Sequence, residues 1–122
     1  MSILIVDDSL DDRLLLETFL RKAGFAELTL ADSAQDSFRQ LGLEAPTREV
    51  NQVDLVLMDI FMTEIDGIEA CRRIKASGRF RDVPIIMITA QTEMEYLQAA
   101  FDAGAIDYIT KPVNKVELLA RV

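Results

Sequence analysis

The sequence predicts an α/β protein with a doubly wound parallel sheet of five strands, each followed by a helix. Five short apolar runs recur along the 122 residues, and amphipathic stretches separate them. Right-handed crossovers leave few other ways to cover a parallel sheet. The length suits one domain, residues 1–122, and a composition of 50% hydrophobic and 28% charged residues suits a chain that folds around its own core.

The predicted strands are continuous apolar runs, as is typical of parallel strands buried on both faces. They comprise residues 3–6, 28–30, 55–58, 85–88 and 106–109. Apolar residues at helical spacing follow each run. The expected helix stripes are Leu16, Phe19, Leu20 and Ala23; Ala34, Phe38 and Leu41; Ile68, Cys71 and Ile74; Leu97, Ala100 and Phe101; and Val116, Leu119 and Ala120.

Capping signals mark the ends of these helices. Residues suited to a helix N-cap precede four of the stripes: Ser9, Ser33, Asp66 and Asn114. Glycines that can stop a helix, Gly24 and Gly104, follow the first and the fourth stripe. This regular alternation favours the strand order 2-1-3-4-5, a flavodoxin-like sheet with five helices.

Two segments are irregular. Residues 42–53, which include Pro46, form a longer connection than is usual between a helix and a strand, and a tolerated insertion is favoured over a private contact surface. The last helix is cut short at Val122, so we expect the parent chain to continue.

Composition excludes several classes of function. The net charge of −8 would repel a phosphate backbone, and no basic stripe offsets it, so no direct binding of nucleic acid is predicted. No apolar run could span a membrane and no signal peptide precedes the first strand, so we expect no membrane contact and a cytoplasmic location. Cys71, the single cysteine, lies on a helix stripe, which favours a buried apolar role over a reactive one.

The carboxyl ends of the predicted strands carry polar residues. Asp7 and Asp8 end the first strand, Asp59 the third and Thr89 the fourth, while Lys111 follows the fifth. Ligands of open α/β sheets bind at this edge, where the strand order reverses. Three converging carboxylates need a cation, and an oxygen-only set in a chain without histidine favours Mg²⁺.

The same residues suit phosphoryl transfer. A carboxylate such as Asp59 can act as a nucleophile and form an aspartyl phosphate, with Mg²⁺ and Lys111 neutralising the transferring group. The Thr89 hydroxyl could donate a hydrogen bond to a phosphoryl oxygen. Each residue alone is a weak signal, but their placement on successive strand ends is specific and indicates a switch, not a metabolic enzyme.

Five segments carry a family resemblance: ILIVDDS at 3–9, DLVLMD at 54–59, DG at 66–67, PIIMITA at 84–90 and DYITKP at 107–112. They resemble the receiver domains of bacterial response regulators over nearly the whole chain. The resemblance implies that Asp59 is the phosphoacceptor and that Asp7, Asp8, Asp59 and the backbone carbonyl of Phe61 hold Mg²⁺. Thr89 and Lys111 would then contact the phosphoryl group.

The resemblance also implies a switch and its partners. Tyr108 matches the aromatic switch position, whose ring turns inward as Thr89 moves; a partly buried tyrosine without motion is the alternative. The family's bond between Lys111 and Pro112 is usually cis. The phosphoryl donor would be a sensor histidine kinase or a histidine phosphotransfer protein. The expected output is a C-terminal domain or an effector protein, read through helix four, strand five and helix five, with a homodimer as one phosphorylated form.

Three positions depart from the family pattern. Thr63 replaces a proline found in many receivers, Phe61 is bulky two residues after the acceptor, and Gln91 holds the matching place after Thr89. One hypothesis is that Phe61 restricts attacking water and prolongs the aspartyl phosphate; the other is that it is merely exposed.

Other classes of function fit less well. A haloacid-dehalogenase-type phosphatase needs a second aspartate where Phe61 stands. A degenerate receiver that only binds partners is opposed by the intact set of site residues. A flavin or nucleotide binder of this fold would need a glycine-rich loop after the first strand, which is lacking.

Overall fold

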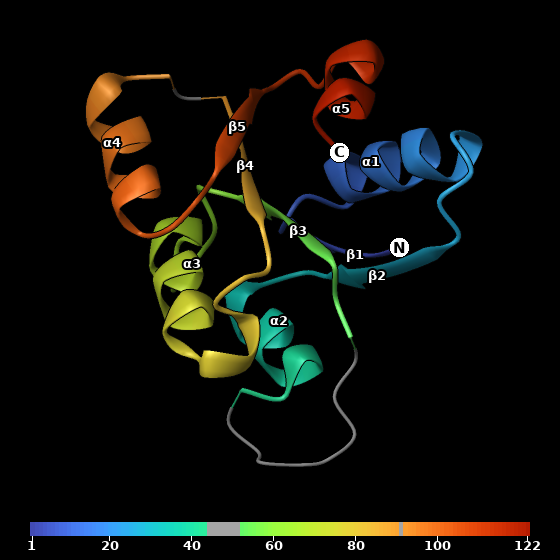
Figure 1. The fold of residues 1–122 in the computed structure, drawn as a ribbon. Coiled ribbons are helices and arrows are strands. Elements are labelled where there is room, and N and C mark those ends of the chain that lie inside the picture. Colours follow the sequence, from blue (N-terminus) through green and yellow to red (C-terminus); the bar gives the residue numbers. More distant parts are fainter. Residues whose placement is uncertain (44–51, 91) are drawn as a thin grey trace.

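A computed structural model describes residues 1–43, 52–90 and 92–122 (Figure 1). The strands are β1 (Ser2–Val6), β2 (Glu27–Ala31), β3 (Leu55–Asp59), β4 (Ile85–Thr89) and β5 (Asp107–Thr110). The helices are α1 (Leu10–Lys22), α2 (Ala34–Leu41), α3 (Gly67–Ala76), α4 (Met94–Asp102) and α5 (Lys115–Arg121), with a 3-10 turn η1 (Gly78–Phe80). All strand pairs are parallel, in the order β2-β1-β3-β4-β5, which confirms the predicted sheet and its five helices.

The sheet divides the core into two clusters. Helices α1 and α5 cover one face, and α2, α3 and α4 cover the other (Figure 1). Successive residues of β1 show the division, because Ile3 and Ile5 pack toward α1 while Leu4 and Val6 pack toward α2 and α3. The central strands β1 and β3 are therefore apolar on both faces, which explains their unbroken runs of apolar residues.

The predicted N-caps are confirmed. The side chains of Ser9, Ser33 and Asp66 each accept a hydrogen bond from a backbone N–H three residues on, and Asn114 accepts two. Each cap satisfies backbone donors that the first turn of a helix leaves unpaired. Helix α4 differs, because its N-cap, Glu93, makes no side-chain capping bond. The caps therefore fix the residues at which these four helices begin.

Several expected core positions are wrong. In α5 the fully buried residue is Leu118, whereas Val116 is 78% exposed. Ala23 is exposed at the end of α1, and Phe101 is 44% exposed on α4. These helices are short or the residues lie at their ends, so a few apolar residues do not fix which face is buried; packing against the sheet decides it. Ile106, placed in the fifth strand, precedes β5 and is 59% exposed.

Cys71 is buried, and its thiol is unreactive at neutral pH. Its side chain is 0% exposed in α3, and the thiol lies 3.6 Å from the carbonyl oxygen of Ala103. Burial raises the pKa of the thiol to about 11, so the thiolate is not formed at neutral pH. The predicted apolar role is confirmed.

Two remaining features complete the fold. Of the irregular segment 42–53, residues 44–51 lie outside the described residues. Within the described part of the chain, none of the helices combines the length and the apolar character that crossing a membrane requires.

Candidate functional site

Three buried polar residues lie together at the carboxyl edge of the sheet. Asp59 and Thr89 are the last residues of β3 and β4, and Asp7 directly follows β1. Their exposed fractions are 5%, 1% and 0%. The strands are in register, with Val6 opposite Met58 and Asp59 opposite Ile88, so the residues that end them meet at one edge. The sheet thus places the side chains that the sequence singled out side by side.

Three carboxylates form a group that could hold a metal ion. Asp7, Asp8 and Asp59 each offer an oxygen, and these oxygens lie within 4.8 Å of one another. Asp7 and Asp59 are buried, whereas Asp8 is exposed. Hard divalent cations prefer oxygen ligands, and an exposed member leaves room for water in the coordination shell. The donor set fits Mg²⁺ and offers no nitrogen or sulfur ligand to a softer metal.

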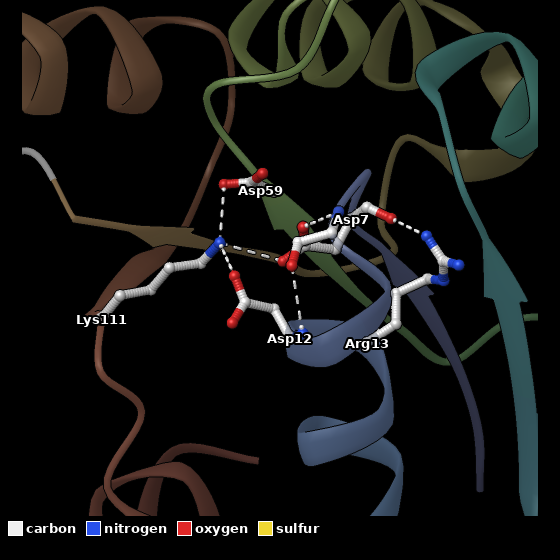
Figure 2. Close-up of polar contacts among 6 residues, drawn as sticks. Asp7, Asp12, Arg13, Asp59 and Lys111 are labelled. Carbon is white, nitrogen blue, oxygen red and sulfur yellow. Dashed lines mark hydrogen bonds and ion pairs between the residues drawn. The ribbon is translucent and has the colours of Figure 1, made fainter.

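Lys111 reaches into this group from the end of β5 (Figure 2). Its Nζ lies 3.0 Å from Oδ2 of Asp7, 2.8 Å from Oδ2 of Asp12 and 3.4 Å from Oδ1 of Asp59. The backbone N–H of Lys111 donates to the carbonyl oxygen of Thr89 at 2.8 Å, and the bond between Lys111 and Pro112 is cis. The ammonium group therefore lies among three carboxylates from three parts of the chain.

Burial and charge set the protonation of the site. Burial, followed by repulsion from Asp7, raises the pKa of Asp59 to about 7, although Lys111 acts to lower it. Burial acts to lower the pKa of Lys111, but the carboxylates of Asp12, Asp59 and Asp7 raise it above its ordinary value. The lysine therefore stays charged, and Asp59 is an unusually easily protonated carboxyl group until a cation offsets the repulsion.

Helix α1 fixes Asp7. The Oδ1 atom of Asp7 accepts a hydrogen bond from the backbone N–H of Ser9 at 2.9 Å. The carbonyl oxygen of Asp7 accepts another from the Arg13 guanidinium at 2.7 Å (Figure 2). Sequence reasoning missed Arg13 and the contact of Asp12 with Lys111. Their place in the first turns of the helix that follows strand one was the available signal, because that helix begins at the same sheet edge.

Gly67 explains the Asp-Gly pair at the start of α3. Its backbone N–H donates to the carbonyl oxygen of Ile60 at 2.7 Å. A Cβ atom on Gly67 would lie 2.0 Å from the carbonyl oxygen of Asp59, a distance at which atoms overlap. Glycine therefore allows α3 to begin directly against the backbone of the candidate phosphoacceptor.

Two aromatic pairs flank the site. The Phe61 ring is 44% exposed and meets the ring of Tyr96 edge to face, with centroids 5.1 Å apart. Tyr108 is partly buried, and its ring lies edge to face with Phe101 at 6.3 Å. Phe61 is thus exposed, as one of the two hypotheses expects, and its ring also packs against Tyr96 of α4. Gln91, the other expected departure near the site, lies outside the described residues.

Comparison with known proteins agrees with this arrangement. The model of the response regulator receiver domain family matches residues 3–122. The transcriptional regulatory protein GltR of Pseudomonas aeruginosa is 37% identical over 121 residues, which are 99% of this chain and 47% of that protein. Response regulator MprA of a Mycobacterium species is 38% identical over 120 residues, 98% of this chain and 48% of MprA. The chain spans about half the length of these curated relatives.

Solved structures give the same result. The receiver domain of sensor histidine kinase PA1611 from Pseudomonas aeruginosa, solved with a magnesium ion coordinated in its active-site cleft, is 31% identical. It has a TM-score of 0.84 and covers 98% of this chain and 92% of its own. Chemotaxis response regulator CheY4 of Vibrio cholerae is 26% identical with a TM-score of 0.85, covering 98% and 93%.

The doubly wound sheet with its acidic edge, together with the family match, places the chain in a class of signalling domains built on this fold. More narrowly, the chain belongs to the response regulator receiver domains of two-component signalling. Phosphorylation on an aspartate is the general function of that family.

Proposed function

We propose that Asp59 is the residue that accepts the phosphoryl group. The observation that carries the proposal is the convergence of Asp59, Asp7 and Lys111 at the carboxyl edge of the sheet, with the ammonium 3.4 Å from Oδ1 of Asp59. In the transfer, an Asp59 oxygen forms a bond to phosphorus while the bond from phosphorus to a donor histidine nitrogen breaks. Lys111 offsets the negative charge that accumulates on the phosphoryl oxygens.

Asp7, Asp8 and Asp59, together with the backbone carbonyl of Phe61, would hold Mg²⁺. When bound, the ion would supply positive charge to neutralise the phosphoryl oxygens. The Asp7 side chain is oriented by the hydrogen bond that it accepts from the backbone N–H of Ser9. The hydroxyl of Thr89, at the end of the neighbouring strand, would donate a hydrogen bond to a phosphoryl oxygen.

Phosphorylation would shift an equilibrium between two conformations through Thr89 and Tyr108. Tyr108 lies within β5, and its ring lies against Phe101 of α4, so inward rotation would change the surface of α4, β5 and α5. The proposed donor is a sensor histidine kinase or a histidine phosphotransfer protein in the cytoplasm. The proposed output is a C-terminal domain or an effector, with a homodimer as one phosphorylated form.

Intact mass after incubation with acetyl phosphate and Mg²⁺ tests this function. We expect a gain of one phosphoryl group that is lost in Asp59→Asn and in metal-free samples. Asp54→Asn is a matched control, because Asp54 lies at the opposite end of β3 and, among the described contacts, its side chain accepts a hydrogen bond only from the backbone N–H of Ser2. No gain in wild type, under conditions that modify a known receiver, would indicate a degenerate interaction module.

A further inference from the structure

Asp12 lies beside the site but outside the group of carboxylates that could hold a metal. That group comprises Asp7, Asp8 and Asp59. Asp12 stands in the first turn of α1, where its backbone N–H donates to the Ser9 side chain at 3.3 Å. Its side chain is 39% exposed, and it points to Lys111 rather than into the metal group (Figure 2). The proposed phosphoryl transfer gives this carboxylate no task.

The shortest contact of the Lys111 ammonium is with Asp12. Its Nζ donates hydrogen bonds to Asp12 at 2.8 Å and to Asp7 at 3.0 Å, whereas Asp59 is an ion-pair partner at 3.4 Å. Both hydrogen-bonded carboxylates belong to the side of the site formed by β1 and α1. Lys111 is therefore held toward α1, and its weakest contact is with the candidate phosphoacceptor.

This placement matters because an ammonium group and a divalent cation compete for the same carboxylate oxygens. Without Asp12, the Lys111 ammonium would form ion pairs only with Asp7 and Asp59, and both of these residues belong to the group that could hold the metal. An ion pair with those two residues would have to loosen before a cation could bind. Asp12 supplies a counter-charge to Lys111 without using a metal ligand.

We propose that Asp12 is a positioning residue that draws the Lys111 ammonium toward α1 and thereby weakens its contact with Asp59, so that this carboxylate is available to a divalent cation. The proposal rests on the proposed function in one respect only, namely that the cation binds the Asp7, Asp8 and Asp59 group. It does not depend on whether Asp59 is phosphorylated. Asp12 would act through Lys111 and would touch neither the cation nor the phosphoryl group.

A double-mutant cycle on Mg²⁺ affinity tests the proposal, with titration calorimetry as the readout. We expect Asp12→Asn to weaken Mg²⁺ binding about fivefold, the equivalent of a partly buried ion pair. Lys111→Met should strengthen Mg²⁺ binding because the competing ammonium is gone. In the Lys111→Met background, Asp12→Asn should change the affinity less than about twofold, since Asp12 then has no lysine to hold.

Asp11→Asn is the matched control. Asp11 is an exposed acidic residue in the same turn of α1, so its replacement removes the same charge and the same favourable interaction with the helix N-terminus. We expect it to change Mg²⁺ affinity by less than about twofold. An equal loss from Asp12→Asn with and without Lys111, or an equal loss from Asp11→Asn, would overturn the proposal and indicate simple attraction between the carboxylate and the cation.

The two proposals fail in different ways. If wild type binds Mg²⁺ and the cycle shows coupling, the role of Asp12 stands even where acetyl phosphate leaves the mass unchanged. If Asp59 is phosphorylated but the cycle shows no coupling, the proposed function stands and the role of Asp12 is wrong. If wild type binds no Mg²⁺ at millimolar concentration, both the metal assignment and the role of Asp12 are wrong.

Discussion

The interior of the sheet and its carboxyl edge are equally buried but chemically opposite. Leu57 in the middle of β3 is 0% exposed among apolar neighbours, and Asp59 at the end of the same strand is 5% exposed among charges. Burial stabilises the first residue and raises the free energy of the second in its charged form. The interior therefore stabilises the fold, whereas holding the buried carboxylate of Asp59 at the edge costs part of that stability.

Leu57→Ala should show the largest effect on stability. We expect a loss of about 4 kcal/mol in the free energy of unfolding, because the change opens a cavity in the centre of the sheet. Urea denaturation measures it. Leu14→Ala is the control, since Leu14 is 46% exposed on α1 and its loss should cost less than about 0.5 kcal/mol. Similar losses in both variants would contradict the assigned core.

Gly67→Ala probes the backbone that joins the interior to the edge. The new Cβ atom would meet the carbonyl oxygen of Asp59, so we expect a loss of about 3 kcal/mol in the free energy of unfolding and weaker Mg²⁺ binding. Gly78→Ala is the matched control, because a Cβ atom there meets nothing within 4 Å. Denaturation and Mg²⁺ titration of both variants make the comparison. Equal stabilities would mean that α3 can move away from β3 without cost.

The raised pKa of Asp59 predicts a stability that depends on pH. The folded carboxyl has a pKa of about 7 against an ordinary 3.8, so the folded state binds the proton more tightly than the unfolded state does. As pH rises from about 4 to about 7, we expect metal-free protein to lose stability through this group, by at most about 4 kcal/mol.

Asp59→Asn isolates that contribution. The variant should lack it and be more stable than wild type at pH 7.5 in a metal chelator, and Mg²⁺ should restore wild type because it offsets the repulsion among the carboxylates. Urea denaturation at pH 5 and at pH 7.5 gives the free energy of unfolding of wild type and of Asp59→Asn. The same pH dependence in wild type and Asp59→Asn would show that other groups cause it.

Phe61→Asn should give the smallest effect, on the lifetime of the phosphorylated form. The Phe61 ring lies two residues after Asp59 and is held against Tyr96, so we expect its loss to admit water and speed dephosphorylation about threefold. The decay of the phosphorylated mass after removal of acetyl phosphate gives the rate. Val116→Asn, at an apolar position that is 78% exposed on α5, should leave the rate unchanged. An unchanged or slower rate in Phe61→Asn would contradict the hypothesis.

The sequence by itself determined the sheet, its strand order and the residues of its carboxyl edge. Continuous apolar runs, N-caps and polar strand ends are local patterns, and the rules for connecting parallel strands narrow the possible topologies to a few, among which the order 2-1-3-4-5 is favoured. The same patterns predicted that Asp7, Asp59, Thr89 and Lys111 lie at one edge of the sheet. The site residues that end a strand or directly follow one could therefore be predicted from the sequence.

Only the tertiary structure decided which face of each short helix is buried and which charged side chains contact one another. Leu118 is buried in place of Val116 because the packing of α5 on the sheet, not its own three or four apolar residues, sets its rotation. Likewise, Asp12 and Lys111 are 99 residues apart in sequence, and their contact exists because α1 begins at the sheet edge where β5 ends. Local pattern carries no information on such a distance, which depends on the summed packing of the whole sheet.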